Sequence, residues 1–230
     1  MNPPVTFTRA GLAVGVRRTL PIALGDFAFG LVFGVVARQA GLSLSESVLM
    51  SGLVFAGAAQ FIAIGLWTAP LPIVSLIVTT LVVNLRHLLM GAALRPWFAR
   101  LAPGKAYGSL FFLTDETWAL AMRDYAAGAR DAAFVLGSGL TLWAAWTSSA
   151  GVGYLVGAGL GDPARWGLDF MFTAVFTALL VGLWKGKTDL LPWAVAAGVA
   201  VAAAQWLPGK WYILLGGLAG SLVGAWRDGR

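Results

Sequence analysis

The chain has 230 residues, of which 59% are hydrophobic and only 11% are charged. Soluble domains carry about 25% charged residues, so this composition offers too little polar surface for a protein folded in water. The formal net charge of +6 does not point to nucleic acid, because the basic residues gather at the ends of apolar segments and in the loops. Cysteine is absent, which excludes disulfides and thiolate metal sites.

The N-terminal apolar stretch follows Arg9, Arg17 and Arg18, an arrangement that also occurs in signal peptides. This stretch contains Asp26, has no small-residue cleavage site after it, and is followed by further apolar segments. We therefore interpret it as the first membrane span.

The next apolar segment, from Ser47 to Leu85, contains no charged residue. A single helix of that length would measure roughly 58 Å, about twice the hydrocarbon core of a bilayer. The segment therefore predicts two spans that fold back on each other near Pro70 and Pro72.

The same reasoning predicts one all-α membrane domain over residues 1–230, a multi-pass bundle of about seven to eight spans with some broken helices. The segment 107–122 is the weakest span because Asp115 and Glu116 lie inside it. The segment 132–158 is long and rich in glycine, which predicts a break or a strong tilt. The expected spans are 19–37, 46–68, 71–93, 107–122, 132–158, 166–184, 189–206 and 210–226.

The orientation of this bundle depends on the number of spans. With eight spans and a cytoplasmic N-terminus, more basic residues lie in cytoplasmic segments than outside, as the positive-inside rule requires. If the segment 107–122 does not cross, the same count favours the opposite orientation. We expect both termini in the cytoplasm.

A short pattern recurs in the two halves of the chain. Asp26 and Asp169 each precede a phenylalanine, and Gln60 and Gln205 each follow two alanines and precede an aromatic residue. The pattern relates the first expected span to the sixth. An odd offset of this kind predicts an inverted repeat of two halves, about 19–122 and 132–226, as in many secondary transporters.

Rows of glycines spaced by four residues occur in two of the expected spans, at 153, 157 and 161 and at 216, 220 and 224. Such rows allow helix backbones to approach closely in lipid. Packing within the bundle is their simpler explanation. We also expect at least one row to hold a helix of a partner subunit or of a second copy of the chain.

The most specific polar cluster is Asn84-Leu85-Arg86-His87, near the end of an apolar segment. On a regular helix Asn84 and His87 share a face, whereas Arg86 points about 160° away from Asn84. Either the helix unwinds here, or Arg86 pairs elsewhere or extends to the membrane surface. His87 is the sole histidine, suited to proton transfer or to a structural hydrogen bond.

Four carboxylates and one amide are the other candidates for a polar site. One of Asp115 and Glu116 could neutralise Arg86 while the other titrates, or both could lie in water on an interfacial helix. Asp26 and Asp169 begin apolar segments, where a helix N-terminus stabilises negative charge without any further role. Gln60 lies among small residues, where an amide binds either a ligand or a neighbouring helix.

Three stretches resemble the AzlC family, the large subunits of bacterial two-component exporters of branched-chain amino acids. They are GLSLSESVLMSGLVFAGAAQFIAIGLW from Gly41 to Trp67, NLRHLLMGAAL from Asn84 to Leu94, and LTDETWAL from Leu113 to Leu120. The resemblance covers about residues 19–185. Where the family has Pro-Phe-Gly near the first span, this chain has Asp26-Phe27-Ala28-Phe29-Gly30.

The resemblance implies export of valine, leucine, isoleucine or methionine across the bacterial inner membrane. It also implies a small AzlD-type subunit of roughly four spans, in a hetero-oligomer. No cofactor is expected, and an ion gradient, expected to be a proton gradient, would drive transport.

A zwitterionic substrate needs a donor for its carboxylate and an acceptor for its ammonium group. Arg86 or helix N-termini are candidates for the first role, and Asp115, Glu116 or Asp169 for the second. Asp26 and His87 are candidates for proton coupling or ion pairing. The residues expected to orient the substrate or contact its aliphatic part are Gln60, Asn84, Phe29, Phe55 and Phe61. A channel-like pore, or a membrane enzyme using His87 with Asp115 or Glu116, are the alternatives.

Overall fold

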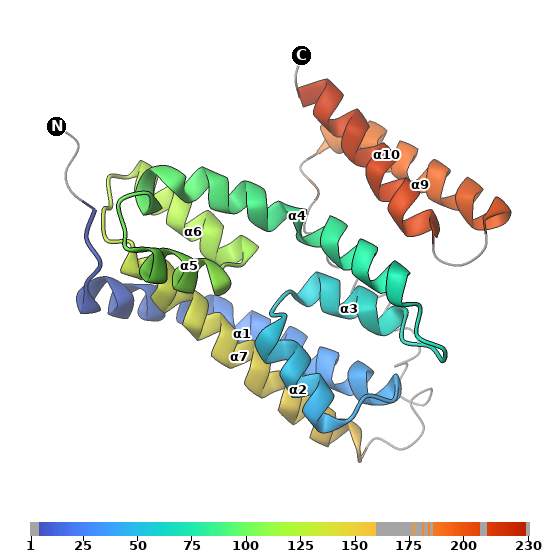
Figure 1. Cartoon of the computed structure of the whole chain (residues 1–230), viewed down its shortest axis with the longest axis horizontal. Coiled ribbons are helices and arrows are strands. Elements are labelled where there is room, and N and C mark those ends of the chain that lie inside the picture. Colours follow the sequence, from blue (N-terminus) through green and yellow to red (C-terminus); the bar gives the residue numbers. More distant parts are fainter. Residues whose placement is uncertain are drawn as a thin grey trace. The chain divides into compact units, whose positions relative to one another are not determined.

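The structure, a computed structural model, describes residues 5–159, 177, 181, 184, 186–207 and 211–228. It divides into two compact units: unit 1 is Met1–Ile64 with Val83–Leu168, and unit 2 is Gly65–Val82 with Asp169–Arg230. The elements in the described parts are helical (Figure 1). They are α1 (Arg9–Gln39), α2 (Leu44–Leu53), α3 (Gly57–Gly65), α4 (Ile73–Phe98), α5 (Pro103–Phe111), α6 (Asp115–Ala126), α7 (Ala133–Gly157), the short 3₁₀ helix η3 (Lys187–Asp189), α9 (Leu190–Trp206) and α10 (Trp211–Asp228).

The expected all-α membrane fold is confirmed. Within the described residues, three helical segments are both long and apolar enough to cross a bilayer: Arg9–Gln39, Ile73–Phe98 and Lys187–Trp206. Helix α7 has 25 residues without a charge, which is about 38 Å of helix. These lengths and compositions are those of helices that can cross a bilayer.

Helices α1 and α7 form the core of unit 1 and run side by side in the same direction (Figure 1). A parallel bridge between Thr6 and Asp131 joins the residues before them, so both helices begin at one end of the unit. Glycines allow the contact: a Cβ on Gly15 would lie 2.2 Å from the carbonyl oxygen of Phe134, and one on Gly153 would lie 2.0 Å from that of Leu31.

Helices α2 and α3 form a re-entrant hairpin, not the expected span 46–68. Gly151 of α7 lies beside Val48, and Trp143 of α7 lies beside Gly52, so α2 runs antiparallel to α7 and stops near its middle. The chain then turns at residues 54–56. The amide of Gln60 in α3 donates to the hydroxyl of Ser51 at 3.3 Å. In a continuous helix these two residues, nine positions apart, would be separated by about 13 Å along the axis, so the chain reverses between them.

Helices α5 and α6 form a second re-entrant hairpin, so the expectation that 107–122 spans the membrane is wrong. With 9 and 12 residues, these helices reach only about 14 and 18 Å. The ammonium of Lys105 in α5 lies 5.1 Å above the ring of Phe7, and Asp124 in α6 pairs with Arg18. The base of this hairpin therefore lies where α1 begins, and its turn at residues 112–114 lies deeper.

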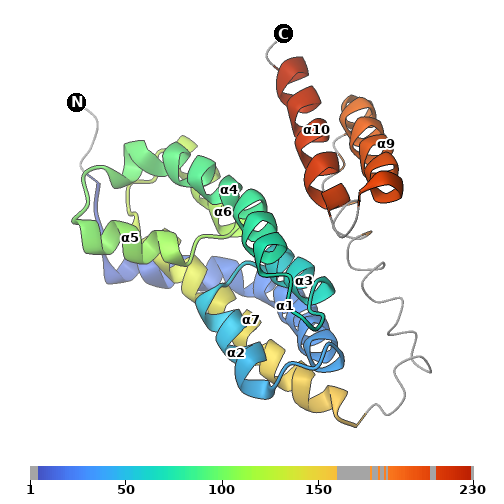
Figure 2. The ribbon, with the colours of Figure 1, turned by 45° about the vertical axis from the view of Figure 1, so that its right-hand side comes forward.

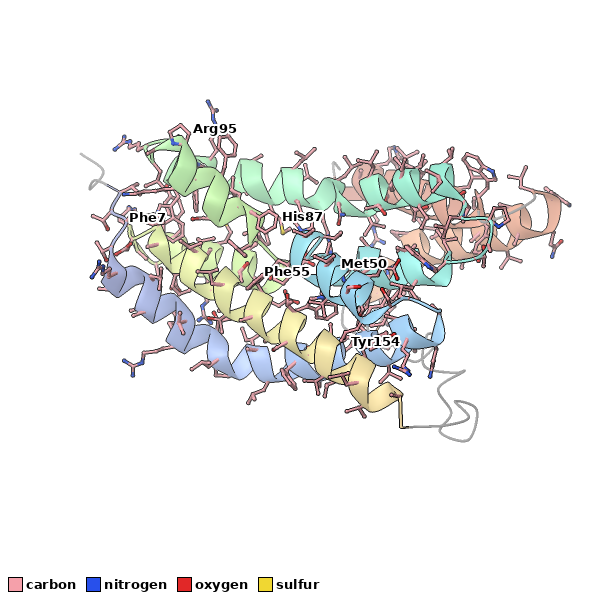
Figure 3. The ribbon with its side chains drawn as sticks, turned by 60° about the horizontal axis from the view of Figure 1, so that its bottom comes forward. Phe7, Met50, Phe55, His87, Arg95 and Tyr154 are labelled. Atoms are coloured by element: carbon pink, nitrogen blue, oxygen red, sulfur yellow. The ribbon has the colours of Figure 1, made fainter. Side chains whose placement is uncertain are left out.

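The two hairpins enter unit 1 from opposite ends. Arg38 of α1 stacks on Tyr154 of α7 at the end where both helices finish, and the α2–α3 hairpin enters there. At the other end, the last turns of α4 pack with α5, α6 and the residues before α1. Figure 3 shows this order along the unit, with Phe7 and Arg95 at one end, Tyr154 towards the other, and Phe55 and His87 between them.

Unit 1 contains two similar segments that run in opposite directions, and they are not the two halves that the sequence pattern relates. A long helix followed by a re-entrant hairpin occurs twice in unit 1: α1 with α2–α3, and α4 with α5–α6 (Figure 2). The part of α4 in unit 1 runs against α1, since its C-terminal turn lies where α1 begins. The expected relation of the first to the sixth span lies partly outside the described residues, as do Asp169 and Gly161.

In unit 2, α9 and α10 pack closely through small residues. A Cβ on Gly216 would lie 2.8 Å from the carbonyl oxygen of Ala196, and one on Gly220 would lie 2.7 Å from the Ala196 methyl group. Gly157 likewise packs on Val35 of α1. Both glycine rows thus contact helices of the same chain in their described parts, as the simpler explanation, packing within the bundle, requires.

Candidate functional site

Arg86 and Asp115 form an ion pair between α4 and the tip of the α5–α6 hairpin. The distance from Arg86 Nη1 to Asp115 Oδ2 is 2.5 Å, and the two side chains are 37% and 50% exposed. Helix α4 continues without interruption from Ile73 to Phe98. Arg86 therefore points to a different neighbour from Asn84, as a regular helix requires, and the helix does not unwind here.

The position of Asp115 follows from the way α6 begins. Thr114 is the N-cap and accepts a hydrogen bond from the backbone N–H of Thr117 at 3.3 Å, while the Thr117 hydroxyl accepts one from the Thr114 N–H at 2.8 Å. This capping box starts the helix immediately after the hairpin turn. Asp115 and Glu116 then occupy the first turn of α6, where the helix dipole stabilises negative charge.

The second carboxylate at this tip, Glu116, is exposed in the first turn of α6. Its charge acts on Asp26, which lies near the middle of α1 and is half-buried. Within the described part of the chain, neither of these carboxylates has an ion pair with Lys, Arg or His. Two carboxylates near each other inside a membrane protein attract a cation or a proton, since both cannot remain charged at low cost.

Asn84 and His87 form a smaller polar group on α4. The His87 Nδ1 lies 3.3 Å from the backbone oxygen of Asn84, one turn earlier. The side-chain oxygen of Asn84 and the Nε of Arg86 are buried and have no hydrogen-bond partner among the described residues. Two buried polar atoms of neighbouring residues on α4 thus lack a partner in the described part of the chain.

Gln60 is buried and hydrogen-bonded to neighbouring helices of the same chain. It is 1% exposed, its Oε1 accepts hydrogen bonds from the Ala56 N–H at 3.2 Å and from Trp146 Nε1 at 3.1 Å, and its Nε2 donates to Ser51. The amide joins α2, the turn, α3 and α7. Of the two roles considered for Gln60, this geometry favours the contact between helices.

The three phenylalanines expected near an aliphatic substrate lie in different environments. Phe61 is buried against Phe33 and Trp146, with ring centroids 5.6 and 6.4 Å away. Phe55 lies in the turn of the α2–α3 hairpin with φ of 44°, a strained conformation for an aromatic residue. Phe29 is half-buried on α1. Only Phe29 and Phe55 are outside this aromatic cluster.

Two residues that the sequence interpretation missed, Trp143 and Trp146, lie at the centre of α7 and hold the hairpins. Trp146 contacts Gly57, Gln60 and Phe61 of α3, and the Trp143 indole N–H donates to the Gly52 carbonyl oxygen at 2.9 Å. Their position in the sequence could have indicated this role, because most tryptophans lie near the ends of apolar segments, whereas these two occupy the middle of one. A tryptophan away from the membrane interface needs a hydrogen-bond acceptor within the protein.

Comparison of the sequence with known proteins identifies the family of this chain. The AzlC protein family model matches residues 21–160, which include all the described helices of unit 1 apart from the start of α1. Among the relatives, an uncharacterized membrane protein of Archaeoglobus fulgidus is 32% identical over 216 residues, which is 92% of this chain and 93% of the relative. Inner membrane protein YgaZ of Escherichia coli is 30% identical over 190 residues, 80% of this chain and 78% of YgaZ.

A third relative carries a functional name. The branched-chain amino acid transport protein AzlC of Bacillus subtilis is 25% identical over 197 residues, covering 85% of this chain and 77% of that protein. No solved structure matches the chain. The family match over more than half of the chain, together with the relatives of 30% identity or more, shows that this membrane protein belongs to the AzlC family.

Proposed function

We propose that the chain is a secondary transporter that exports neutral aliphatic amino acids, with valine, leucine, isoleucine and methionine as the expected substrates. The observation that carries this proposal is the position of Asp26 and Glu116: the two carboxylates lie close enough for their charges to interact, and neither has an ion pair among the described residues. The name of the Bacillus subtilis relative supports the substrate class.

The carboxylate pair suits the ammonium group of an amino acid. An ammonium group brings a positive charge and three hydrogen-bond donors, whereas the carboxylates offer only acceptors. When no substrate is bound, a proton on one of the carboxylates reduces the repulsion between them in the same way as the positive charge of the ammonium group. Binding of substrate and binding of a proton therefore exclude each other in part, which is the coupling that a proton-driven exporter needs.

The substrate carboxylate needs a different partner. Asp115 already neutralises the charge of Arg86, and the buried Arg86 Nε, which has no partner among the described residues, could donate to a substrate only if the side chain moves. The N-terminus of α3 is the other candidate, because it begins inside unit 1 beside Trp146 at Gly57. Asn84, whose side-chain oxygen is unpartnered in the described part of the chain, completes the polar set.

The distribution of charge in unit 1 favours a cytoplasmic N-terminus. The end where α1 begins also holds the end of α4, the base of the α5–α6 hairpin and the start of α7. The opposite end has Arg38. The positive-inside rule therefore supports a cytoplasmic location for the basic end. The basic residues at this end are Arg9, Arg17, Arg18, Arg95, Arg100, Lys105, Arg123 and Arg130.

The active form of this transporter includes a small AzlD-type membrane subunit in a hetero-oligomer of the bacterial inner membrane. The family resemblance supports this partner. The exposed side of the part of α4 in unit 1 is compatible with it, because Leu85, Leu88 and Leu89 are 53–74% exposed and need apolar cover.

The test is export of labelled valine from proteoliposomes that contain the chain and its candidate partner, with and without a pH gradient. In the same export assay, Asp26→Asn and Glu116→Gln should show the loss of gradient-driven transport. Glu46→Gln is the matched control, because Glu46 caps α2 through Ser43 at the other end of unit 1. Gradient-independent, non-saturable flux would instead indicate a channel. Conversion of the amino acid would indicate an enzyme.

A further inference from the structure

Both re-entrant hairpins contact the same side chain of α7. The Trp143 indole N–H donates to the Gly52 carbonyl oxygen at 2.9 Å, in the last turn of α2. The Trp143 ring meets the Phe112 ring edge to face, with centroids 5.8 Å apart, at the turn between α5 and α6. These two hairpins enter from opposite ends of unit 1, and one residue touches the deepest part of each.

The contact with Gly52 has a clear physical role. The last four carbonyl groups of a helix lack partners within it, and in a bilayer no water replaces them at low cost. The indole N–H supplies a partner for one of these groups. Because the donor lies on α7, the hydrogen bond also determines how far α2 extends along α7.

The contact with the second hairpin is equally close. A Cβ on Gly139, one turn before Trp143, would lie 2.3 Å from the Phe112 carbonyl oxygen, so the turn backbone lies directly on α7. Phe112 lies two residues before Thr114, the N-cap of α6. The capping box that begins at Thr114 positions Asp115 and Glu116. A shift of Phe112 along α7 therefore moves both carboxylates.

We infer that Trp143 is a positioning residue that keeps the two hairpin tips in register, and so sets the distance between the α3 N-terminus and the carboxylates of α6. This inference extends the proposed transport function, since those are the groups assigned to the two ends of the amino acid. Trp143 acts through the tips and does not need to touch the substrate.

The first experiment does not depend on transport. Because the chain contains no cysteine, Val54→Cys and Ala119→Cys introduce two spin labels at exposed positions, one beside each tip. Pulsed electron paramagnetic resonance in lipid nanodiscs then measures the distance between the hairpins. Trp143→Phe removes the N–H donor but keeps a ring, and we expect the distance distribution to broaden about twofold. Phe112→Leu, which removes the other ring, should broaden it as well.

The matched control is Trp118→Phe. The Trp118 indole N–H is buried without a partner among the described residues, so the same substitution removes a donor that makes no hydrogen bond. Its distance distribution should equal that of the parent. Equal distributions for Trp143→Phe, Phe112→Leu and the parent would overturn the inference.

The second experiment measures valine export by the same variants with the candidate partner present. Misplaced tips weaken substrate binding, so the KM of Trp143→Phe should rise about threefold or more, with a smaller change in maximal rate. Loss of folded protein alone would lower the maximal rate and leave KM unchanged. A parent that exports no amino acid would refute the proposed function, while the distance measurement would still decide the role of Trp143.

Discussion

The two re-entrant hairpins of unit 1 have the same architecture but are held in place by different forces. The α2–α3 hairpin has neutral side chains at its tip and is held by hydrogen bonds from Gln60, Trp143 and Trp146. The α5–α6 hairpin carries charge along its second helix. It is held by Arg86 at its tip and by Arg18 near its base.

This difference separates a fixed element from a responsive one. The hydrogen bonds of the first hairpin are buried and respond little to an ion gradient. The ion pairs of the second hairpin are partly exposed, and they lie beside carboxylates that can bind a proton or an ammonium group. We therefore expect the second hairpin to sense the substrate and the coupling ion, while the first provides a rigid wall. The following predictions test that comparison.

The largest effect is expected for Arg86→Ala, which leaves Asp115 without its cation. An uncompensated charge inside a membrane protein costs more than the ~1.4 kcal/mol that corresponds to a factor of ten, so export should fall about tenfold or more. Valine export at matched protein levels in the membrane is the measurement. Arg95→Ala, at the exposed end of the same helix, is the control and should export normally. Near-normal export by Arg86→Ala would show that the ion pair is dispensable.

A smaller loss is expected for Gly139→Ala, which changes the backbone contact of the charged hairpin without changing its charge. The added methyl group would lie 2.3 Å from the Phe112 carbonyl oxygen and must displace the turn. Overpacking of this kind costs about 1–3 kcal/mol, so export should fall roughly fivefold. Gly108→Ala in α5 is the control, because nothing lies within 4 Å of its Cβ position. Equal export by both variants would mean that the turn tolerates displacement.

For the neutral hairpin, Gln60→Leu should reduce stability more than it changes the dependence on pH. It leaves the Ala56 N–H and the Trp146 indole N–H without their acceptor, at about 1–3 kcal/mol for a buried unsatisfied group. The melting temperature in detergent should therefore fall, while the pH profile of the remaining export stays the same. Gln205→Leu, at an exposed position of α9, should melt normally. A shifted pH profile would contradict the assignment of this hairpin as a rigid wall.

The smallest effect is expected for Arg18→Gln at the base of the charged hairpin. Arg18 pairs with Asp124 and stacks on Phe134 at 5.4 Å, but its side chain is 37% exposed, so the pair contributes only about 0.2–1 kcal/mol. Export should change less than about twofold. The melting-temperature difference from the parent should shrink as salt is added. Arg17→Gln serves as the control, and a difference independent of salt would assign the effect to packing.

The sequence by itself determined the membrane class, the boundaries of α4, α7, α9 and α10 within a few residues, and the candidates Asp26, Arg86, Asp115 and Glu116. These features follow from local properties: the length of apolar segments, the cost of charge in lipid, and the capping residues of helices. Hydropathy measures whether a segment prefers lipid. It does not report whether that segment crosses the membrane or turns back within it.

Only the tertiary structure decided that the segments 46–68 and 107–122 are hairpins, and which charges meet. The turn after α2 depends on hydrogen bonds from residues 60, 143 and 146, which lie up to 91 positions away in sequence. In the same way, Asp115 and Glu116 are adjacent in sequence, but Asp115 pairs with Arg86 of α4, whereas the charge of Glu116 acts on Asp26 of α1. A helix places consecutive side chains about 100° apart, and only the neighbours packed around it determine what each of them contacts.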